Sequence, residues 1–124
     1  MNRNLAATGA LLMLLAVALG AFGAHVLEPI IGEDAVGTYE TGVHYHMIHG
    51  IAMILAGMAS GIGGDRKRLR WAGRLFFIGI VFFSGSLYLL ATAGWSWLGP
   101  ITPLGGLSFL AGWFMLGLGV FKRN

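Results

Sequence analysis

Four runs of about 20 residues with almost no charge constrain the fold of this chain more than any other feature. A helix of about 20 apolar residues crosses the roughly 30 Å hydrocarbon core of a bilayer and satisfies its own backbone polar groups. The runs cover residues 5–24, 43–62, 71–93 and 102–121. They predict an all-α integral membrane protein, a single domain whose four transmembrane helices form an up-down bundle.

The composition excludes other protein classes. Of the 124 residues, 56% are hydrophobic and 10% are charged, whereas a soluble domain has roughly 25% charged residues. A mean hydropathy of +0.77 excludes a disordered chain. Because the chain has no Cys, disulfides, thiolate metal sites and a Cys nucleophile are excluded as well.

The first run has a competing interpretation as a cleaved signal peptide. Arg3 precedes it, and Ala16-Val17-Ala18 resembles a cleavage site. The apolar run is longer than the 7 to 15 residues that are typical of a signal peptide, so about 20 residues favour a retained helix.

The charged residues divide between the two sides of a four-span chain. All eight Lys and Arg residues fall on one side: Arg3, the cluster from Arg66 to Arg74, Lys122 and Arg123. The polar segment 25–42 on the other side carries Glu28, Glu33, Asp34 and Glu40, and Asp34 is expected to cap a short helix there. Basic residues favour the cytoplasmic side, which predicts cytoplasmic termini (N-in/C-in). The same rule explains the basic cluster, so we expect no nucleic-acid partner.

Small residues recur at four-residue intervals along three of the runs. In lipid, helices associate through close packing of such residues. The positions predicted to pack helices are Gly20, Ala24, Gly57, Gly61, Ser108 and Gly112. This packing could lie within one chain or between subunits, so a homo-oligomer or a larger membrane complex is expected besides the lipid bilayer.

Polar side chains inside the runs are the natural place to look for function, because they are costly in lipid without partners. They gather toward the outer half of the membrane: His25, His46, His49, Ser84, Ser86, Tyr88 and Thr102. The three-and-four spacing of His46, His49, Gly50 and Met53 marks one helical face. We therefore expect His46 and His49 to point into the bundle and His44 to point elsewhere.

Three interpretations of this polar cluster remain open. The first is structural, with His25, His49, Ser86 and Tyr88 hydrogen-bonded to fix the register of the helices. The second is metal or haem ligation, in which His46 and His49 would bind one ion with His25 as third ligand. The third is a small-ligand pocket, for a lipid headgroup or quinone, that is closed by Tyr88, Trp113 and the Thr102-Pro103 turn.

Catalysis has little support in the sequence. Ser84 and Ser86 lie near histidines in this prediction, but no acidic residue within a span could orient an imidazole. We expect a protein that is not an enzyme, without cofactor or bound metal. It would serve as an accessory or scaffolding component of the membrane; the alternative is a lipid- or small-solute-handling protein.

Four sequence motifs, one in each span, carry a resemblance to a known family. They are Gly20-Ala21-Phe22-Gly23-Ala24-His25, Thr41-Gly42-Val43 with Tyr45 and His49, Phe83-Ser84-Gly85-Ser86-Leu87-Tyr88, and Thr102-Pro103-Leu104-Gly105-Gly106 with Gly112-Trp113. In this order the chain resembles the YgdD-like family of small four-span bacterial inner-membrane proteins, a domain of unknown function. The resemblance implies a bacterial inner (plasma) membrane location and no established activity or cofactor. It also implies Gln in relatives at the position of His46, which disfavours a metal site that depends on His46.

Overall fold

The computed structural model describes residues 1–123 as an all-helical chain with four long helical segments. The first segment comprises α1 (Arg3–Phe22), a π-helical stretch (Gly23–Leu27) and α2 (Glu28–Ile31). The second is α3 (Glu33–Ala59), which ends in a 3₁₀ turn (Ser60–Ile62). The third joins α4 (Arg66–Gly79) to α5 (Gly85–Ala93) through a π-helical stretch (Ile80–Ser84). After a 3₁₀ turn (Ser96–Leu98), α6 (Thr102–Phe121) forms the fourth.

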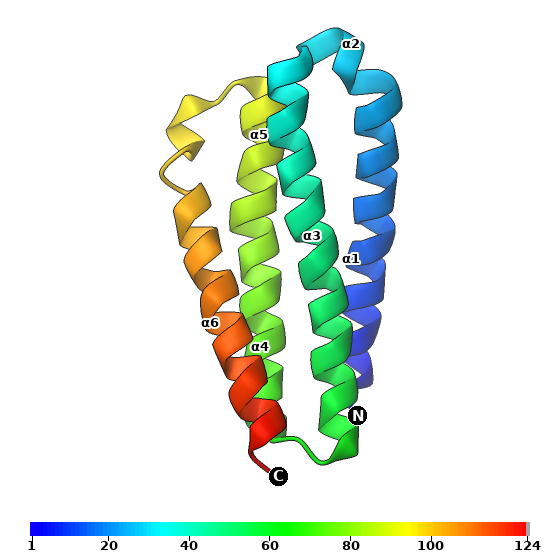
Figure 1. Cartoon of the computed structure of the whole chain (residues 1–124), viewed down its shortest axis with the longest axis vertical. Helices are drawn as coiled ribbons and strands as arrows, with labels where there is room; N and C mark the ends of the chain where they lie inside the picture. Colours follow the sequence, from blue (N-terminus) through cyan, green and yellow to red (C-terminus); the bar gives the residue numbers. More distant parts are fainter. Residues whose placement is uncertain (124) are drawn as a thin grey trace.

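All four segments are long and apolar enough to cross a membrane. They run up and down in turn, and the two chain ends lie at the same end of the bundle (Figure 1). The four predicted runs therefore correspond to the four helical segments. The Pro103 expected in the first turn of the last helix stands there, where its missing N–H is harmless.

The polar segment 25–42 differs from its prediction. A separate short helix capped by Asp34 was expected, but α1 continues through α2, and α3 already begins at Glu33. Gly32 alone reverses the chain, with φ of 90° in the left-handed region. Glu33 and Asp34 lie in the first turn of α3, where acidic side chains favour the positive end of the helix dipole.

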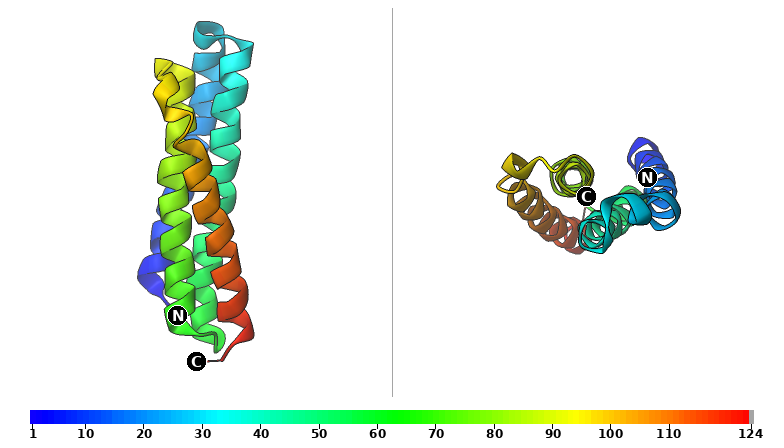
Figure 2. Two further views of the ribbon diagram at one scale, coloured as in Figure 1. Left: turned by 90° about the vertical axis from the view of Figure 1, so that its left-hand side faces the viewer. Right: turned by 90° about the horizontal axis from the view of Figure 1, so that it is seen from above.

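Helix α3 is the centre of the arrangement. It packs along α1 on one side and against α4 and α5 on the other, while α6 packs mainly on α4. The view along the helix axes accordingly shows that α3 lies between α1 and the pair formed by α4–α5 and α6 (Figure 2). The larger buried apolar cluster joins α3, α4 and α6: Ala52, Met53, Ala72, Phe76, Ile80 and Phe109.

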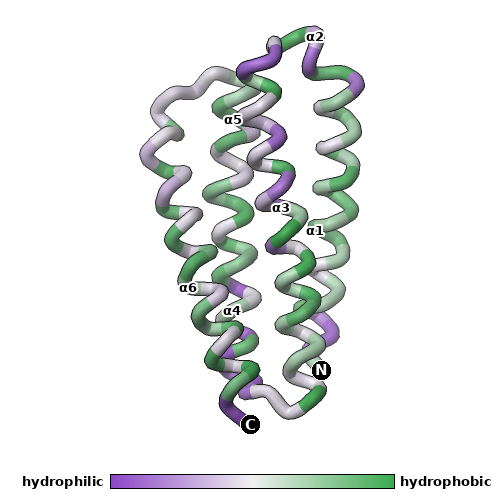
Figure 3. Tube along the Cα trace, in the orientation of Figure 1, coloured by the Kyte–Doolittle hydropathy of each residue, from purple (hydrophilic) through white to green (hydrophobic). Residues whose placement is uncertain are grey.

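The charged residues divide between the two ends of the bundle. We call the end with Arg3, Arg66–Arg74, Lys122 and Arg123 the basic end, and the end with Glu28, Glu33, Asp34 and Glu40 the acidic end. Hydrophilic residues also follow the half of α3 nearer the acidic end (Figure 3). The middle of the other helices is largely apolar, as lipid requires.

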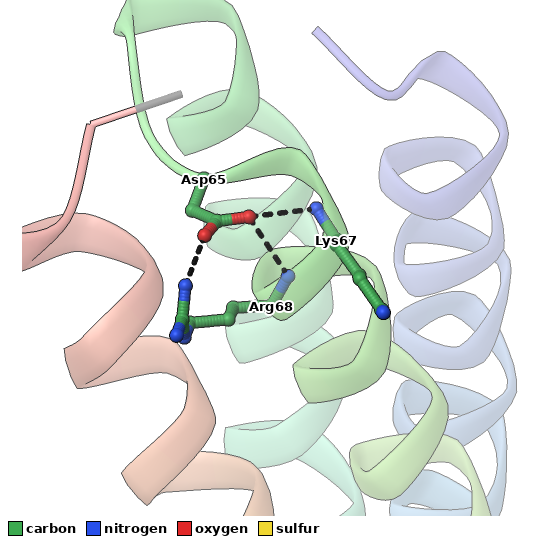
Figure 4. A network of polar contacts seen from close by, with 3 residues as sticks. All are labelled: Asp65, Lys67 and Arg68. Atoms are coloured by element: carbon green, nitrogen blue, oxygen red, sulfur yellow. Dashed lines mark hydrogen bonds and ion pairs between the residues drawn. The ribbon is translucent and has the colours of Figure 1, made fainter.

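Short polar contacts tie the helix ends together at the basic end. The backbone N–H of Asn2 donates to the Gly57 carbonyl at 2.9 Å, which joins the start of α1 to the end of α3. Asp65 caps α4: its side chain accepts from the N–H groups of Lys67 and Arg68 and pairs with the Arg68 guanidinium (Figure 4). The Arg68 N–H above all, then the guanidinium and the Lys67 N–H, hold the pKa of Asp65 below its usual range.

Candidate functional site

The predicted outer polar residues lie between the acidic end and the middle of the bundle, and several of them connect different helices. The predicted direction of the histidines on α3 is confirmed, since His46 and His49 are buried and His44 is exposed. The seven predicted residues do not form one cluster. Instead the structure divides most of them among three separate hydrogen-bonded pairs.

The first pair joins α3 to α5. Nδ1 of His46 lies 2.8 Å from the Tyr88 hydroxyl. The Tyr88 ring packs against Tyr39 at 5.2 Å between centroids, and the Tyr39 hydroxyl donates to the Leu19 carbonyl of α1 at 2.6 Å. A Cβ at Gly42 would lie 3.0 Å from the Tyr88 ring, so the glycine lets this ring pack closely on α3.

The other ring nitrogen of His46 has a different environment. Nε2 is buried and makes no hydrogen bond within the described residues. The backbone of Leu12 in α1 lies close to the His46 ring. His46 is therefore a half-satisfied polar group, and one hydrogen bond to Tyr88 fixes its ring.

The second pair joins α3 to α6 and fixes the chemical state of His49. Nδ1 of His49 lies 2.6 Å from the Tyr45 carbonyl, an acceptor, so Nδ1 carries a proton. Nε2 accepts the indole N–H of Trp113 at 3.0 Å, so it carries none. The ring also stacks on Phe109, with centroids 3.5 Å apart. His49 is thus a neutral imidazole with both nitrogens occupied.

The third pair joins α5 to α6 through two hydroxyl groups. The oxygens of Ser86 and Thr102 lie 2.6 Å apart, and Ser86 also donates to the Phe83 carbonyl at 2.8 Å. This pair lies beside the π-helical stretch. A side chain at Gly105 would overlap the Phe83 backbone, so α6 and the π-helical stretch touch closely here.

Ser84 and His25 have no partner in the described residues. Ser84 is fully buried within the π-helical stretch, and its hydroxyl makes no hydrogen bond there. His25 lies exposed in the other π-helical stretch. The structure therefore brings neither Ser84 nor His25 into a pair, and it does not assemble the structural network of His25, His49, Ser86 and Tyr88.

The metal alternative requires His25, His46 and His49 around one ion. Within residues 1–123 no group of three or more His, Asp or Glu side chains is placed to hold a metal. His49 has no nitrogen to spare for an ion, and His25 is not beside it. The side chains that are present do not fit the ligand set that the alternative needs.

The predicted packing residues mostly serve contacts within the chain. A Cβ at Gly57 would lie 2.8 Å from the Asn2 carbonyl, at Gly61 2.7 Å from Met1, and at Gly112 2.7 Å from Phe76. Ser108 donates to the Leu75 carbonyl at 2.7 Å, and Gly20 faces Val43 of α3. Ala24 is exposed.

Two residues that contact the predicted polar side chains were not among the seven: Tyr39, which packs on Tyr88, and Trp113, which bonds to His49 and was named only as closing the ligand-pocket alternative. Tyr39 is buried, and its hydroxyl donates to the Leu19 carbonyl of α1. The same three-and-four spacing that marks His46 and His49 extends back through Gly42 to Tyr39, so this signal was present. No spacing within one helix reveals that Trp113 meets His49, because that contact joins residues 64 positions apart.

An open groove of about 760 Å³ lies between α3 and α6 beside the second pair. Its lining includes Tyr45 and His49 from α3 and Gly106, Leu110 and Trp113 from α6, without any Lys, Arg, Asp or Glu. Leu110 and Leu107 at its edge are 68% and 61% exposed. In a bilayer this groove faces lipid.

Comparisons with known proteins agree on one family of membrane proteins of unknown function. Residues 19–106 match the family described as "Protein of unknown function (DUF423)". The UPF0382 membrane protein YwdK of Bacillus subtilis is 48% identical over 118 residues, covering 92% of this chain and 93% of the relative. A UPF0382 membrane protein of Staphylococcus haemolyticus is 47% identical over 114 residues, 92% of each chain. No solved structure matches.

Proposed function

This chain belongs to the DUF423 family of membrane proteins, and from that premise we propose that it is a non-catalytic accessory protein that self-associates within a bacterial plasma membrane. The observation that carries the proposal is the apolar groove between α3 and α6. The predicted packing residues face neighbours within the chain, with Ala24 as the exception. The groove therefore offers a further surface on which a helix from another subunit can pack.

The state of the buried polar groups supports a non-catalytic role. Both nitrogens of His49 are engaged, by the Tyr45 carbonyl and the Trp113 N–H. Ser86 and Thr102 bond to each other. Such pairs connect helices and hold them in register, which is what interhelical hydrogen bonds do in membrane proteins.

The shape of the groove supports a second copy of the chain as the occupant. A twofold interface places the same patch on both subunits, so that patch has to carry both a hollow and a projection. Here Gly106 lies in the groove, while Leu107 and Leu110 project from the same helix. Because the lining has no charged residue, two copies can approach without placing a charge in lipid.

The proposal includes an orientation. All eight Lys and Arg residues lie at the basic end, together with both termini, and the acidic end has none. Lys and Arg in short loops favour the cytoplasm. In the proposed orientation both termini are cytoplasmic, the His46–Tyr88 and Ser86–Thr102 pairs lie in the outer half of the membrane, and the His49–Trp113 pair lies near its middle.

Disulfide cross-linking in native membranes tests self-association, because the natural chain has no Cys that would interfere. We expect Leu110→Cys in the groove to give a covalent dimer on mild oxidation. Leu14→Cys, on the exposed face of α1, is the matched control, with 62% exposure against 68% for Leu110. Equal cross-linking of the two variants would overturn the proposed surface. A product with another mass would assign the groove to a different membrane protein.

A lipid- or small-solute-binding role is the second candidate, because the groove has the size of a ligand pocket. Its volume of about 760 Å³ lies within the roughly 300–1,000 Å³ of small-molecule sites. Native mass spectrometry of protein extracted gently from its own membrane separates the two candidates. A dimer without an adduct supports self-association, whereas a monomer with one stoichiometric small molecule supports ligand binding.

A further inference from the structure

A second groove, on another side of α3, lies between α1 and α4 at the basic end. It has a volume of about 600 Å³. Both helices pack on α3, and Leu5 of α1 reaches Gly73 of α4 across the groove. An adjoining hollow of about 450 Å³ shares Asn2, Asn4 and Arg70 with it. Neither space belongs to the α3–α6 groove of the proposed function.

The rim of this groove is cationic and not neutralised. Arg66, Arg70 and Arg74 follow one another at four-residue intervals along α4, so they share one face, and all three are exposed. Arg70 and Arg74 line the groove, and Arg66 lines the adjoining hollow. None of the three forms an ion pair within residues 1–123. Asp65, the one acidic side chain at this end, is bound to Arg68.

The floor of the groove is mainly apolar and extends away from the basic rim. Phe77 and Ile78 line it beyond Arg74, and Leu5 of α1 lies opposite Gly73; the Thr8 hydroxyl, also in the lining, bonds to the Asn4 carbonyl of its own helix. At 1.5 Å per residue, Ile78 lies about 12 Å farther along the helix than Arg70. The groove thus changes from cationic to apolar over a distance that leads from the membrane surface into the hydrocarbon core.

This order of chemistry matches an anionic phospholipid. Arginine binds phosphate oxygens with two parallel hydrogen bonds, and basic pockets between transmembrane helices bind anionic headgroups. The apolar floor would hold an acyl chain, which nucleic acids and free phosphate lack. A second copy of this chain would bring the same positive charges to the rim and be repelled.

We propose that the groove between α1 and α4 is a binding site for one anionic phospholipid of the leaflet at the basic end. Its phosphate lies between Arg70 and Arg74, and an acyl chain follows Leu5, Phe77 and Ile78. Trp71, which lies under the Arg74 guanidinium at 5.1 Å, packs against the headgroup region at the rim. This site is independent of self-association through the α3–α6 groove.

Native mass spectrometry with defined lipids tests the site. Detergent-purified protein is titrated with an equimolar mixture of phosphatidylglycerol and phosphatidylcholine that carry identical acyl chains. We expect wild type to retain one phosphatidylglycerol. The double variant Arg70→Gln, Arg74→Gln should bind this lipid at least about tenfold more weakly, because each basic residue near the surface contributes to anionic-lipid binding. Equal retention of the two lipids by wild type would overturn the proposal.

Two further variants distinguish lipid binding in the groove from a general attraction of anionic lipid to the positive charge at this end. Lys122→Gln with Arg123→Gln removes the same number of charges from the same end but outside the groove. It should keep the wild-type preference, and a loss as large as that of the arginine pair would overturn the site. Ile78→Trp keeps every charge and fills the floor at a position that is 40% exposed, so the fold tolerates it. It should release the lipid, and full retention would contradict binding in the groove.

The source of the phosphate is tested with a soluble competitor. Glycerol 3-phosphate, at the concentration of the lipid, should leave the bound phosphatidylglycerol in place, because it has no acyl chain for the floor. Complete displacement would show a phosphate site that does not need a lipid and would contradict the proposal. Circular dichroism of each variant, with the wild-type helical signal, ensures that lost lipid does not reflect lost fold.

Discussion

The two halves of the bundle are held together by different means. From the acidic end to the middle, side-chain hydrogen bonds link α3 to α1, α5 and α6, through Tyr39, His46 and His49. From the middle to the basic end, glycines bring α1 and α3 into backbone contact: Gly9 of α1 faces the Gly50 carbonyl, and Gly57 faces the start of α1. Between α1 and α3, hydrogen bonds there lie at the helix ends, such as that of Asn2 with Gly57, and between α4 and α6 Ser108 donates to the Leu75 carbonyl.

The difference shows how lipid changes the problem of packing helices. No hydrophobic force draws apolar helices together in a bilayer, so close contact and hydrogen bonds have to do it. A hydrogen bond fixes rotation and register but contributes only about 0.6 kcal/mol on average inside membranes. A backbone contact cannot yield to a larger side chain. We therefore expect steric changes at the basic-end half to exceed polar deletions at the other half.

The largest effect is expected from Gly9→Leu. A Cβ at Gly9 would lie 2.6 Å from the Gly50 carbonyl oxygen and 3.0 Å from the Ile54 nitrogen, both backbone atoms. Because α1 packs chiefly on α3, separating the pair should lower the free energy of unfolding by about 3 kcal/mol. Unfolding with sodium dodecyl sulfate in mixed micelles, followed by circular dichroism, measures this loss.

Gly37→Ala is the matched control for that substitution. Nothing lies within 4 Å of a Cβ at this helical glycine. Alanine should raise the free energy of unfolding by about 0.5–1 kcal/mol, because glycine is a poor helix former. If Gly9→Leu costs no more than the loss of a hydrogen bond, the contrast between the two halves is wrong.

The next effect concerns the pair of His49 and Trp113. His49→Ala leaves the indole N–H of Trp113 without an acceptor, which should lower the free energy of unfolding by about 1–3 kcal/mol. Trp113→Phe keeps an aromatic ring and removes the donor, so it should cost less. In a double-mutant cycle the two losses should not add, because they share one bond. Additive losses would show that the bond to Trp113 contributes nothing and that His49 stabilises the fold through its other contacts, such as Phe109 and the Tyr45 carbonyl.

The sequence predicts the helices better than it predicts their ends. Apolar runs and the three-and-four spacing on α3 arise within one helix, so they identify four spans and the inward face of His46 and His49. The extension of α1 through α2 and of α3 back to Glu33 lies in polar sequence, where hydropathy has no signal. There a single glycine, Gly32, replaces the expected longer connection.

The hydrogen-bond partners within the candidate site could not be predicted from the sequence for a related reason. Whether His49 meets Trp113 or His25 depends on how helices cross, and no periodicity records that. The π-helical stretches at Gly23–Leu27 and Ile80–Ser84 shift the residues that follow them around the helix axis. Regular spacing therefore gives no register across the stretches that contain His25 and Ser84.

A smaller effect is expected from Ser86→Ala. The substitution removes the bond from α5 to Thr102 on α6, so the free energy of unfolding should fall by about 0.6 kcal/mol. Thr92→Ala is the control, because the exposed Thr92 hydroxyl bonds only to Tyr88 of its own helix. That variant should match wild type in the same titration. A loss from Ser86→Ala as large as that from Gly9→Leu would reverse the order of the two halves.

The smallest effect is a pH dependence at the basic end, where polar groups act at the membrane surface and not within it. The N–H groups of Arg68 and Lys67 and the Arg68 guanidinium bind the ionised Asp65 and lower its pKa in the folded state. The stabilisation is complete above the unfolded pKa of about 3.9 and is lost as pH falls toward the lower folded value. Wild type should therefore lose stability relative to Asp65→Asn between pH 5 and the acid limit of the titration, roughly the range in which aspartates protonate. Asparagine retains the cap without the charge. If the stability of the two proteins changes with pH in the same way, the charge of Asp65 does not stabilise this end of the bundle.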